Sequence, residues 1–238
     1  MERNILIIKH IDIEGPGTLE YFLRSQNFFK LEIVELYREK TLPPIETCAA
    51  VISLGGPMNV YETDKYPFLK TEEDFLKSAI EKEIPILGIC LGAQLLAKVC
   101  GSSVKKAKYK EIGWYKISLT DYGKNDQLFS GLADEIIVFQ WHEDTFEIPK
   151  NALHLAKSKN CSNQAFRYGK NSYGIQFHIE VTSEMIENWF LEYKEKNLDI
   201  KKILSQTQKL KDELQKEANL IYSNFLNIIK NRVSKNGI

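Results

Sequence analysis

Apolar residues in the first half of the chain come in short, uninterrupted runs, and the segments between these runs show helical spacing. Such runs have the length and composition of strands that are buried on both faces. We expect these strands at residues 4–9, 31–36, 49–54 and 84–89. We expect helices at residues 19–25 and 70–82, and a third from Cys90 to a stop near Gly101. Strands that alternate with helices predict an α/β fold, with an open, mostly parallel sheet and helices on both faces.

The pattern changes in the second half of the chain. From about Tyr115 onward, short β-like runs replace the alternation, at residues 136–139, 165–168 and 173–177. We expect these runs to add antiparallel strands to the sheet. Residues 185–193 have helical spacing, and residues 200–229 place apolar side chains at intervals of three, four and seven. This last stretch contains neither Gly nor Pro and predicts one long amphipathic helix.

The C-terminal segment also differs in charge. Residues 194–238 hold ten basic and five acidic side chains, a net charge of +5, which leaves −5 for the rest of the chain. We expect two parts: a domain at residues 1–195 and an amphipathic helix extension at residues 196–238. The helix is expected to pack on its own domain. The alternative is that it docks a partner or a second copy, so it is the candidate surface for a homo-oligomer.

The composition excludes several classes of protein. The chain has 32 Lys+Arg and 32 Asp+Glu among 238 residues, and this balance provides no basic excess for binding nucleic acid. The first apolar run is too short for a signal peptide, and no stretch approaches the length needed to cross a membrane. The four cysteines are scattered, without CxxC or His/Cys metal-ligand spacing. We therefore expect reduced thiols in a cytoplasmic protein that has no metal and no cofactor.

One cysteine stands between a predicted strand and a predicted helix. The sequence Gly88-Ile89-Cys90-Leu91-Gly92 has glycine two positions before and two positions after Cys90, as a sharp, crowded turn requires. Such a turn exposes the thiol at the carboxyl end of the strand, next to the backbone N–H groups of a helix N-terminus. We therefore expect Cys90 to be a nucleophile. The alternative is a buried cysteine in a glycine-rich turn.

A cysteine nucleophile needs a base, and His178 is the strongest candidate among the four histidines. It closes the apolar run at residues 173–177, and Glu180 follows two residues later. If the extended conformation continues, both side chains lie on the same side of the strand, where the carboxylate can orient the imidazole. His10 and His154 are expected to be structural or exposed.

A glycine pair follows the third predicted strand. Gly55-Gly56-Pro57 should lie at the carboxyl edge of the sheet, where ligands of α/β proteins bind. Glycine allows a peptide N–H to approach a tetrahedral oxyanion closely, and the N–H of Leu91 is the expected partner of the Gly56 N–H. Without the cysteine turn, a simple strand-to-loop connection would be the better interpretation.

Together these motifs resemble those of the class I, triad-type glutamine amidotransferases. The resemblance rests on Gly55-Gly56-Pro57, on Gly88-Ile89-Cys90-Leu91-Gly92-Ala93-Gln94 and on Gln176-Phe177-His178-Ile179-Glu180, and it covers roughly residues 4–195. The stand-alone branch similar to the amidotransferase domain of GMP synthase fits best, because of Glu111-Ile112-Gly113-Trp114 and Trp141-His142-Glu143-Asp144. The fold implied is the family's flavodoxin-like α/β sheet.

The resemblance implies an activity, the hydrolysis of the side-chain amide of glutamine. Cys90 would attack the amide carbon and form a γ-glutamyl thioester. His178 would act first as base and then as acid, held by Glu180, and the N–H groups of Gly56 and Leu91 would form the oxyanion hole. Ammonia would then pass to a synthase. The substrate-binding positions that the resemblance implies are Gly55, Gln94, Trp141, His142 and Glu143.

Two features depart from the pattern of that family. Relatives near GMP synthase commonly have Gly at the position of Glu143, which affects how this segment holds the substrate. In addition, no ATP-using synthase domain, with its Gly-rich phosphate loop and Lys, follows in the chain. We therefore expect either a separate synthase subunit that accepts the ammonia or a free amidase.

Other functions are also open. The same triad is suited to hydrolysis of γ-glutamyl amides or peptides other than glutamine. An α/β-hydrolase also uses a nucleophile at such a turn, but its acid normally precedes its histidine, whereas Glu180 follows His178. The alternative from a different class is a non-catalytic relative that acts in regulation or senses redox state through Cys90.

Overall fold

The computed structural model of the chain describes residues 3–39, 41–195 and 198–235. In the first strand, Ile5 and Ile7 enter the core on one face of the sheet, and Leu6 and Ile8 enter the core on the other. All four are buried, as expected for a strand between two layers of helices. The parallel half of the sheet comprises, in spatial order, β2 (Lys30–Glu35), β1 (Asn4–Lys9), β3 (Cys48–Ser53), β4 (Ile86–Ile89) and β9 (Ser172–Ile175).

The other half of the sheet is antiparallel. Beyond β9 it continues with β8 (Ala165–Tyr168), β7 (Leu153–Ser158), β5 (Val104–Leu119) and β6 (Glu135–Phe146). We did not predict a strand at residues 104–114, because its first part is rich in lysines that face solvent. The α/β class is confirmed, and so are the antiparallel strands that we predicted at residues 136–139 and 165–168. The prediction was wrong in part for residues 173–177, because β9 is antiparallel to β8 but pairs in parallel with β4. The nine-stranded sheet is nevertheless mixed, rather than mostly parallel.

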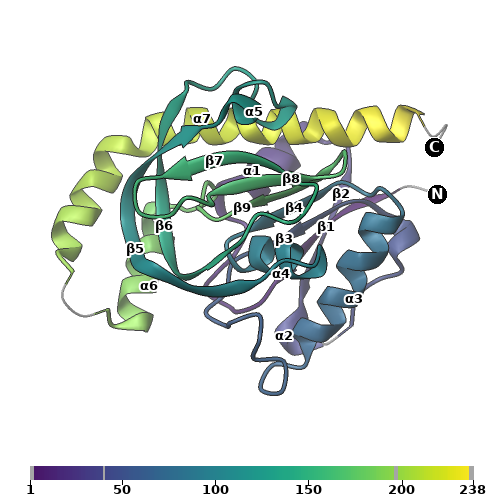
Figure 1. Ribbon diagram of the computed structural model, residues 1–238, viewed down its shortest axis with the longest axis horizontal. Coiled ribbons are helices and arrows are strands. Elements are labelled where there is room, and N and C mark those ends of the chain that lie inside the picture. Colours follow the sequence, from purple (N-terminus) through teal and green to yellow (C-terminus); the bar gives the residue numbers. More distant parts are fainter. Residues whose placement is uncertain (1–2, 40, 196–197, 236–238) are drawn as a thin grey trace.

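Helices cover both faces of the sheet (Figure 1). The helices α1 (Gly17–Gln26) and α7 (Ile200–Lys235) pack on one face, and α3 (Phe68–Glu81) and α4 (Leu91–Val99) pack on the other. A smaller cluster, containing Phe139 and Trp189, lies between β6, α6 (Ser183–Tyr193) and the first turns of α7. The remaining elements are α2 (Leu36–Glu39), α5 (Asp121–Lys124) and the 3₁₀ turns Ile45–Thr47 and Gln127–Phe129.

The long C-terminal helix packs on its own domain. Ala218, Ile221 and Phe225 are buried in the same hydrophobic core as the strands of the parallel half. This confirms the expected packing, and it means that the chain itself covers the apolar face that suggested a homo-oligomer. Self-association through this helix stays a prediction. So does a domain boundary at residue 195, which adjoins residues 196–197 outside the described ranges.

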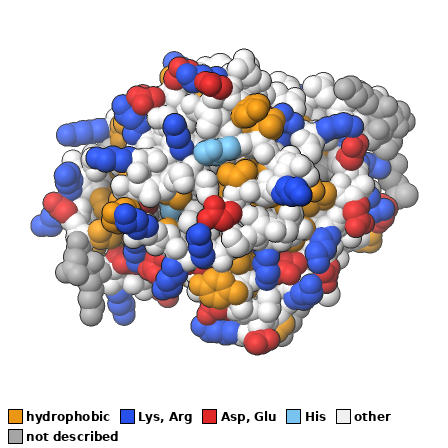
Figure 2. Space-filling model, viewed as in Figure 1, with side chains coloured by type: hydrophobic (Ala, Val, Ile, Leu, Met, Phe, Trp, Pro, Cys, Tyr) orange, Lys and Arg blue, Asp and Glu red, His pale blue; other side chains and the backbone are white. Residues whose placement is uncertain are grey.

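Charged side chains are mixed on the surface. Figure 2 shows Lys and Arg interspersed with Asp and Glu over the visible face, in keeping with the balance of 32 basic and 32 acidic residues. Within the described ranges, none of the helices combines the length and the apolar character that a membrane span requires.

Candidate active site

Cys90 lies at a sharp turn between β4 and α4, at the carboxyl end of the parallel strands. Its backbone has φ +52° and ψ −105°, a conformation that L-residues rarely adopt, and its side chain is buried. A Cβ on Gly88 would lie 2.5 Å from the carbonyl oxygen of Gly92, and a Cβ on Gly92 would lie 2.2 Å from that of Ser53. The two glycines therefore allow this turn to form, in agreement with the predicted strand-to-helix turn.

His178 and Glu180 contact each other directly. Nδ1 of His178 is 2.7 Å from Oε1 of Glu180, and Oε2 of Glu180 accepts a 2.9 Å hydrogen bond from the N–H of Ile179. The N–H of His178 donates to the carbonyl oxygen of Phe139 at 2.9 Å, which holds this segment against β6. The strand ends at Ile175, so the condition under which strand periodicity would align His178 and Glu180 is not met. Local backbone conformation, rather than strand periodicity, therefore brings the two side chains together.

The pKa of His178 is raised well above its ordinary value. Burial has the largest effect and would lower this pKa, because it disfavours the charged imidazolium. The negative charge of Glu180 and that of a Cys90 thiolate, together with the hydrogen bonds that the ring donates to both groups, outweigh burial and raise the pKa. The ring also packs edge-on against Trp189, with 5.0 Å between ring centroids. Glu180 and a Cys90 thiolate thus both stabilise the proton on His178.

The glycine-rich loop after β3 lies against Cys90 and His178. A Cβ on Gly55 would be 3.0 Å from Cε1 of His178 and 3.8 Å from Cβ of Cys90. The backbone N–H groups of Gly56 and Leu91, our two expected oxyanion donors, bind no acceptor within the part of the chain that the structure describes. Both N–H groups are therefore available to a ligand.

The segment at residues 141–143 lies on β6, with its backbone next to the thiol. Sγ of Cys90 is 3.6 Å from the carbonyl oxygen of Trp141. The indole of Trp141 packs on Phe190, with 4.7 Å between ring centroids. The side chain of Glu143 is half exposed and forms an ion pair with Lys110, in which Oε1 and Nζ are 2.6 Å apart.

His142 belongs to a buried polar cluster. Its Nδ1 is 2.9 Å from the carbonyl oxygen of Asp144, and its Nε2 is 3.0 Å from Oε2 of Glu111, which also accepts a 2.9 Å hydrogen bond from Gln164. We predicted no metal site, yet ligand-type atoms of Glu111, His142 and Cys161 lie within 4.8 Å of one another. The hydrogen bonds of Glu111 give a sufficient reason for this cluster to exist.

Gln94, one turn into α4, connects the helix to two other segments. Its Nε2 donates to the carbonyl oxygen of Asp144 at 3.1 Å and to Oε1 of Gln176 at 3.2 Å. Nε2 of Gln176 in turn lies 3.7 Å from Sγ of Cys90. We named Gln94 from the sequence but not Gln176, although Gln176 stands two residues before His178 in the same motif.

These residues surround one pocket of about 310 Å³. The predicted site residues that line it are Gly56, Cys90, Gln94, Trp141, His142, Glu143 and His178. Gly55, Leu91 and Glu180 do not line it. The other lining residues include Glu14, Lys110, Tyr193 and Glu195, none of which we predicted from the sequence. They come from segments far apart in the chain, and no local motif marks them.

Glu14 is the buried carboxyl group among these additions. Its Oε1 accepts a 2.7 Å hydrogen bond from the hydroxyl of Tyr193, and the residue is 7% exposed. Burial raises the pKa of Glu14, against the positive charge of His178 and the hydrogen bond from Tyr193. The one signal in the sequence was its place in the loop after the first strand, at the same sheet edge as Cys90.

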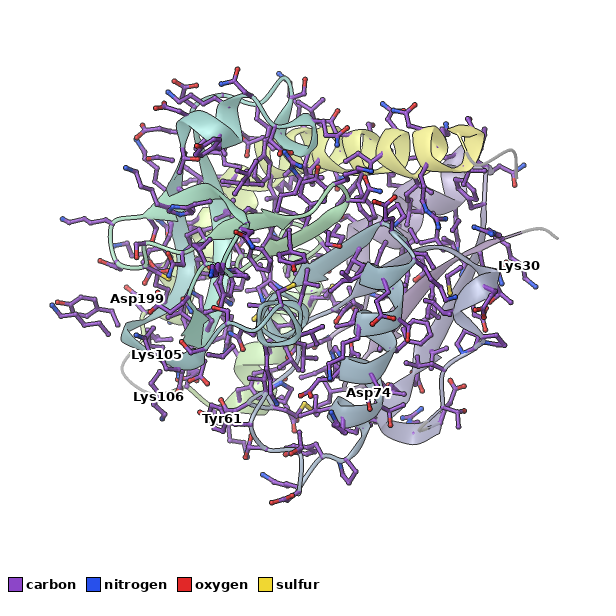
Figure 3. All side chains as sticks on the ribbon, turned by 45° about the vertical axis from the view of Figure 1, so that its right-hand side comes forward. Lys30, Tyr61, Asp74, Lys105, Lys106 and Asp199 are labelled. Atoms are coloured by element: carbon purple, nitrogen blue, oxygen red, sulfur yellow. The ribbon has the colours of Figure 1, made fainter. Side chains whose placement is uncertain are left out.

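An ion-pair cluster borders the pocket. Nζ of Lys110 is 2.6 Å from Oε1 of Glu143 and 2.6 Å from Oε1 of Glu195. Nζ of Lys106 lies 3.9 Å from Oε2 of Glu143. Figure 3 shows Lys105 and Lys106 at the outer edge of the molecule, at the start of β5. The cluster therefore ties β5, β6 and the segment after α6 together at the rim of the pocket.

Comparison with known proteins shows the family. Residues 20–194 match the family model described as glutamine amidotransferase class-I. The chain is 30% identical over 184 residues to the Salmonella typhimurium glutamine amidotransferase-like protein YfeJ, covering 76% of this chain and 77% of that protein. It is 35% identical over 162 residues to one subunit of the glutamine-hydrolyzing GMP synthase from Sulfolobus acidocaldarius, covering 67% and 81%. The chain therefore belongs to the class I glutamine amidotransferase family.

The fold of a solved relative agrees with this family. The crystal structure of a glutamine amidotransferase from Thermotoga maritima matches with a TM-score of 0.87 and 36% sequence identity. The match covers 94% of this chain and 98% of that one, so it includes much of α7. The resemblance that the motifs indicated is thus confirmed for both family and fold.

Proposed function

We propose that the protein is a glutamine amidotransferase of the glutaminase type, which hydrolyses the side-chain amide of glutamine through a γ-glutamyl thioester on Cys90. The observation that carries this proposal is that Cys90, His178 and Gly56 line one pocket, with Glu180 bonded to His178 behind it. The N–H groups of Gly56 and of Leu91, the residue next to Cys90, bind no acceptor among the described residues. A thiol, a base held by a carboxylate and two available peptide N–H groups are the parts that acyl transfer through cysteine requires.

The first half of the reaction forms the thioester. His178 takes the proton of the Cys90 thiol, and the thiolate attacks the amide carbon of glutamine. The tetrahedral oxyanion accepts hydrogen bonds from the N–H groups of Gly56 and Leu91. The imidazolium, stabilised by Glu180 at 2.7 Å, then donates its proton to the departing nitrogen. The C–N bond breaks, ammonia leaves, and the γ-glutamyl thioester remains on Cys90.

The second half hydrolyses the thioester. His178 accepts a proton from water as the water oxygen attacks the thioester carbonyl carbon. The same two N–H groups bind the new oxyanion, and the C–S bond breaks as it collapses. The proton on His178 returns to the sulfur, so that glutamate and the free thiol of Cys90 are the products.

The polar rim of the pocket suits the other end of the substrate. Free glutamine carries an α-ammonium and an α-carboxylate, and the rim offers Lys110 beside Glu143 and Glu195. The backbone of Trp141 and the side chain of Gln94 form the adjoining walls. We propose that these groups bind the charged end of glutamine while Gly55, which has no side chain, leaves room beside Cys90 for the amide.

We further propose that the ammonia is delivered to a separate synthase subunit. The relative from Sulfolobus acidocaldarius supports this, because its name describes one subunit of a glutamine-hydrolyzing synthase. The test is product formation by a captured synthase subunit with glutamine or with ammonia as nitrogen source. We expect Cys90→Ala to abolish only the glutamine-dependent reaction. If Cys90→Ala leaves the glutamine-dependent reaction intact, this delivery is wrong.

The experiment that tests the proposed function is glutamate release from glutamine by wild type, by Cys90→Ala and by a control, Cys100→Ala. Cys100 follows α4 and does not line the pocket. We expect activity in wild type and the control and none in Cys90→Ala. If wild type is inert even in the presence of cell extract, the proposal is wrong. Turnover of γ-glutamyl amines or peptides without turnover of glutamine would favour the alternative substrate class.

A further inference from the structure

Three buried polar side chains lie next to the glycine-rich loop, outside the pocket. His10 directly follows β1, Glu72 lies on α3, and Ser53 ends β3; each is 0% exposed. Nδ1 of His10 is 2.9 Å from the carbonyl oxygen of Gly55, and Nε2 of His10 is 2.6 Å from Oε2 of Glu72. Oγ of Ser53 donates a 2.6 Å hydrogen bond to Oε1 of Glu72. None of the three lines the pocket, so none contacts a substrate there.

The hydrogen bond from His10 to Gly55 has a fixed direction. A carbonyl oxygen only accepts, so Nδ1 of His10 carries a proton whether the ring is neutral or charged. On the other side of the ring, Nε2 and Glu72 share one proton, and both placements of that proton leave the Nδ1–H in place. Burial would lower the pKa of His10, but the charge and hydrogen bond of Glu72, together with the Gly55 carbonyl, raise it. His10 is therefore a permanent donor to this carbonyl.

The carbonyl of Gly55 belongs to the same peptide unit as the N–H of Gly56. In a trans peptide these two groups point in opposite directions, and no cis bond occurs within the described residues. Holding the Gly55 carbonyl toward His10 thus aims the Gly56 N–H away from His10, and Gly56 lines the pocket. Because both residues are glycine, this peptide has few other restraints on its rotation.

Ser53 extends the same network toward the second oxyanion donor. A Cβ on Gly92 would lie 2.2 Å from the carbonyl oxygen and 2.4 Å from Oγ of Ser53, so the two backbones are in close contact. The N–H of Gly92 donates to the carbonyl oxygen of Leu54 at 3.1 Å. Gly92 follows Leu91, which carries the second donor. Glu72 therefore links the loop after β3 to the first turn of α4.

The network contains the residue types of a hydrolytic triad in a different order. In a triad the imidazole faces the hydroxyl. Here Ser53 bonds to the carboxylate of Glu72, and the imidazole of His10 bonds to a backbone carbonyl. The Ser53 hydroxyl is 0% exposed and does not line the pocket, so no substrate reaches it there, and we interpret this arrangement as one that holds the backbone in place.

We propose that His10 is a positioning residue for the oxyanion hole: anchored on Glu72, it locks the Gly55–Gly56 peptide so that the Gly56 N–H faces the substrate carbonyl. This inference rests on the proposed function. The Gly56 N–H acts mainly on the oxyanion of the transition state. Its misalignment therefore lowers kcat while glutamine binding, and with it KM, changes little.

Two variants of His10 separate this role from a purely structural one. In His10→Asn, the amide nitrogen occupies the position of Nδ1 and still donates to Gly55, but the contact with Glu72 is lost. In His10→Gln, the amide nitrogen occupies the position of Nε2 and keeps Glu72, but the bond to Gly55 is lost. We expect kcat of His10→Asn to stay within about threefold of wild type and that of His10→Gln to fall about 100-fold, the cost of one oxyanion donor, with little change in KM.

A second readout isolates the oxyanion hole from other effects. The γ-semialdehyde of glutamate adds to the Cys90 thiol: a C–S bond forms, and the thiol proton passes to the former aldehyde oxygen. This adduct places an oxygen in the hole, so its affinity should fall in His10→Gln in parallel with kcat. Alkylation of Cys90 by iodoacetamide uses no oxyanion hole, and its rate should be the same in both variants. Both variants are first checked for cooperative thermal unfolding.

The outcomes distinguish this inference from the proposed function. If wild type hydrolyses glutamine and the two variants lose kcat equally, or lose it in the order of their thermal stabilities, His10 is only structural and the inference is overturned. If kcat of His10→Gln falls but its affinity for the semialdehyde does not, the inference is also overturned. If wild type releases no glutamate at all, the proposed function itself fails.

Discussion

The hydroxyl of Tyr222 on the C-terminal helix donates a 2.9 Å hydrogen bond to the carbonyl oxygen of Ile179. Ile179 stands between His178 and Glu180, so α7 directly supports the backbone that places these two side chains. Tyr222 is 1% exposed, and its hydroxyl is also 2.9 Å from Oγ1 of Thr18. The helix that we predicted as an extension is thus coupled to the candidate active site.

Removing this hydroxyl should affect both stability and turnover. Tyr222→Phe leaves the buried carbonyl of Ile179 without this donor, so we expect the free energy of unfolding to fall by about 1 kcal/mol. We also expect kcat to fall several-fold, because the segment from His178 to Glu180 loses a restraint. Tyr21→Phe, at an exposed position on α1, is the matched control and should change neither. Urea unfolding measures the stability, and the glutaminase assay measures kcat. An unchanged kcat in Tyr222→Phe would contradict the claim that α7 supports the segment from His178 to Glu180.

Glu180→Gln should lower the pKa of His178. Burial already opposes the charged ring, and the carboxylate of Glu180 is the first of the groups that offset burial. We therefore expect the alkaline limb of the kcat/KM profile to move to lower pH, with a fall in kcat. Glu184→Gln, at an exposed position in the first turn of α6, should leave the profile in place. An alkaline limb that stays at its wild-type pH in Glu180→Gln would contradict this account.

The interaction between His178 and Glu180 also predicts how the stability of the protein depends on pH. A histidine whose pKa is higher in the folded state binds its proton more tightly when folded. Its contribution to stability is complete below the unfolded pKa of about 6.5 and is lost as pH rises through the folded pKa. The stability difference between wild type and Glu180→Gln should therefore be larger near pH 6 than at alkaline pH. Denaturant unfolding at the two pH values measures it.

Glu217 on α7 should destabilise the protein at neutral and alkaline pH. Burial raises its pKa to about 7, and the charge of Glu213 adds to this; its Oε2 has no hydrogen-bond partner among the described residues. The folded state then holds the proton more tightly, so stability decreases as pH rises from about 4.5 to 7. Glu217→Gln should raise the free energy of unfolding at pH 8 by about 1 kcal/mol, after allowance for partial exposure. Equal stability of the variant and wild type at pH 8 would exclude this effect.

Gly55→Ala should abolish most of the activity. The new Cβ would lie 2.5 Å from Oε2 of Glu14 and 3.0 Å from Cε1 of His178, so one or both side chains must move. We expect kcat/KM to fall at least ~100-fold, comparable to the loss of an oxyanion donor. Gly15→Ala is the control, because no atom lies within 4 Å of the Cβ it would introduce. Wild-type activity in Gly55→Ala would show that this space is not needed.

Features that depend on residues close together in the sequence could be predicted. The turn that holds Cys90 follows from an apolar strand, two glycines and a helix within about a dozen residues. Strand β5 was missed at residues 104–114, since its charged, exposed residues are held in a strand by pairing with β6. In this stretch the paired residues lie between 25 positions (Trp114 and Phe139) and 42 positions (Val104 and Phe146) apart, so no local pattern in the sequence indicates the strand.

The supporting groups of the site could not be predicted for a related reason. Glu14 and Tyr193 meet across 179 positions of sequence, and His10 and Glu72 meet across 62. Each is an ordinary residue in its own segment, and only the order of the strands brings them to the carboxyl edge of the sheet. The structure places His178 beside Glu180, as we predicted. Strand periodicity is not the cause, because the strand ends before these residues.

The central claim is that Cys90 carries the γ-glutamyl group during turnover. The most direct measurement is peptide mass spectrometry after glutamine is mixed with the protein and the reaction is rapidly quenched with acid. We predict a γ-glutamyl adduct on the peptide that contains Cys90, formed before glutamate appears and absent from Cys90→Ala. Glutamate release at the wild-type rate with no adduct on Cys90, or with an adduct on another residue, would contradict the account.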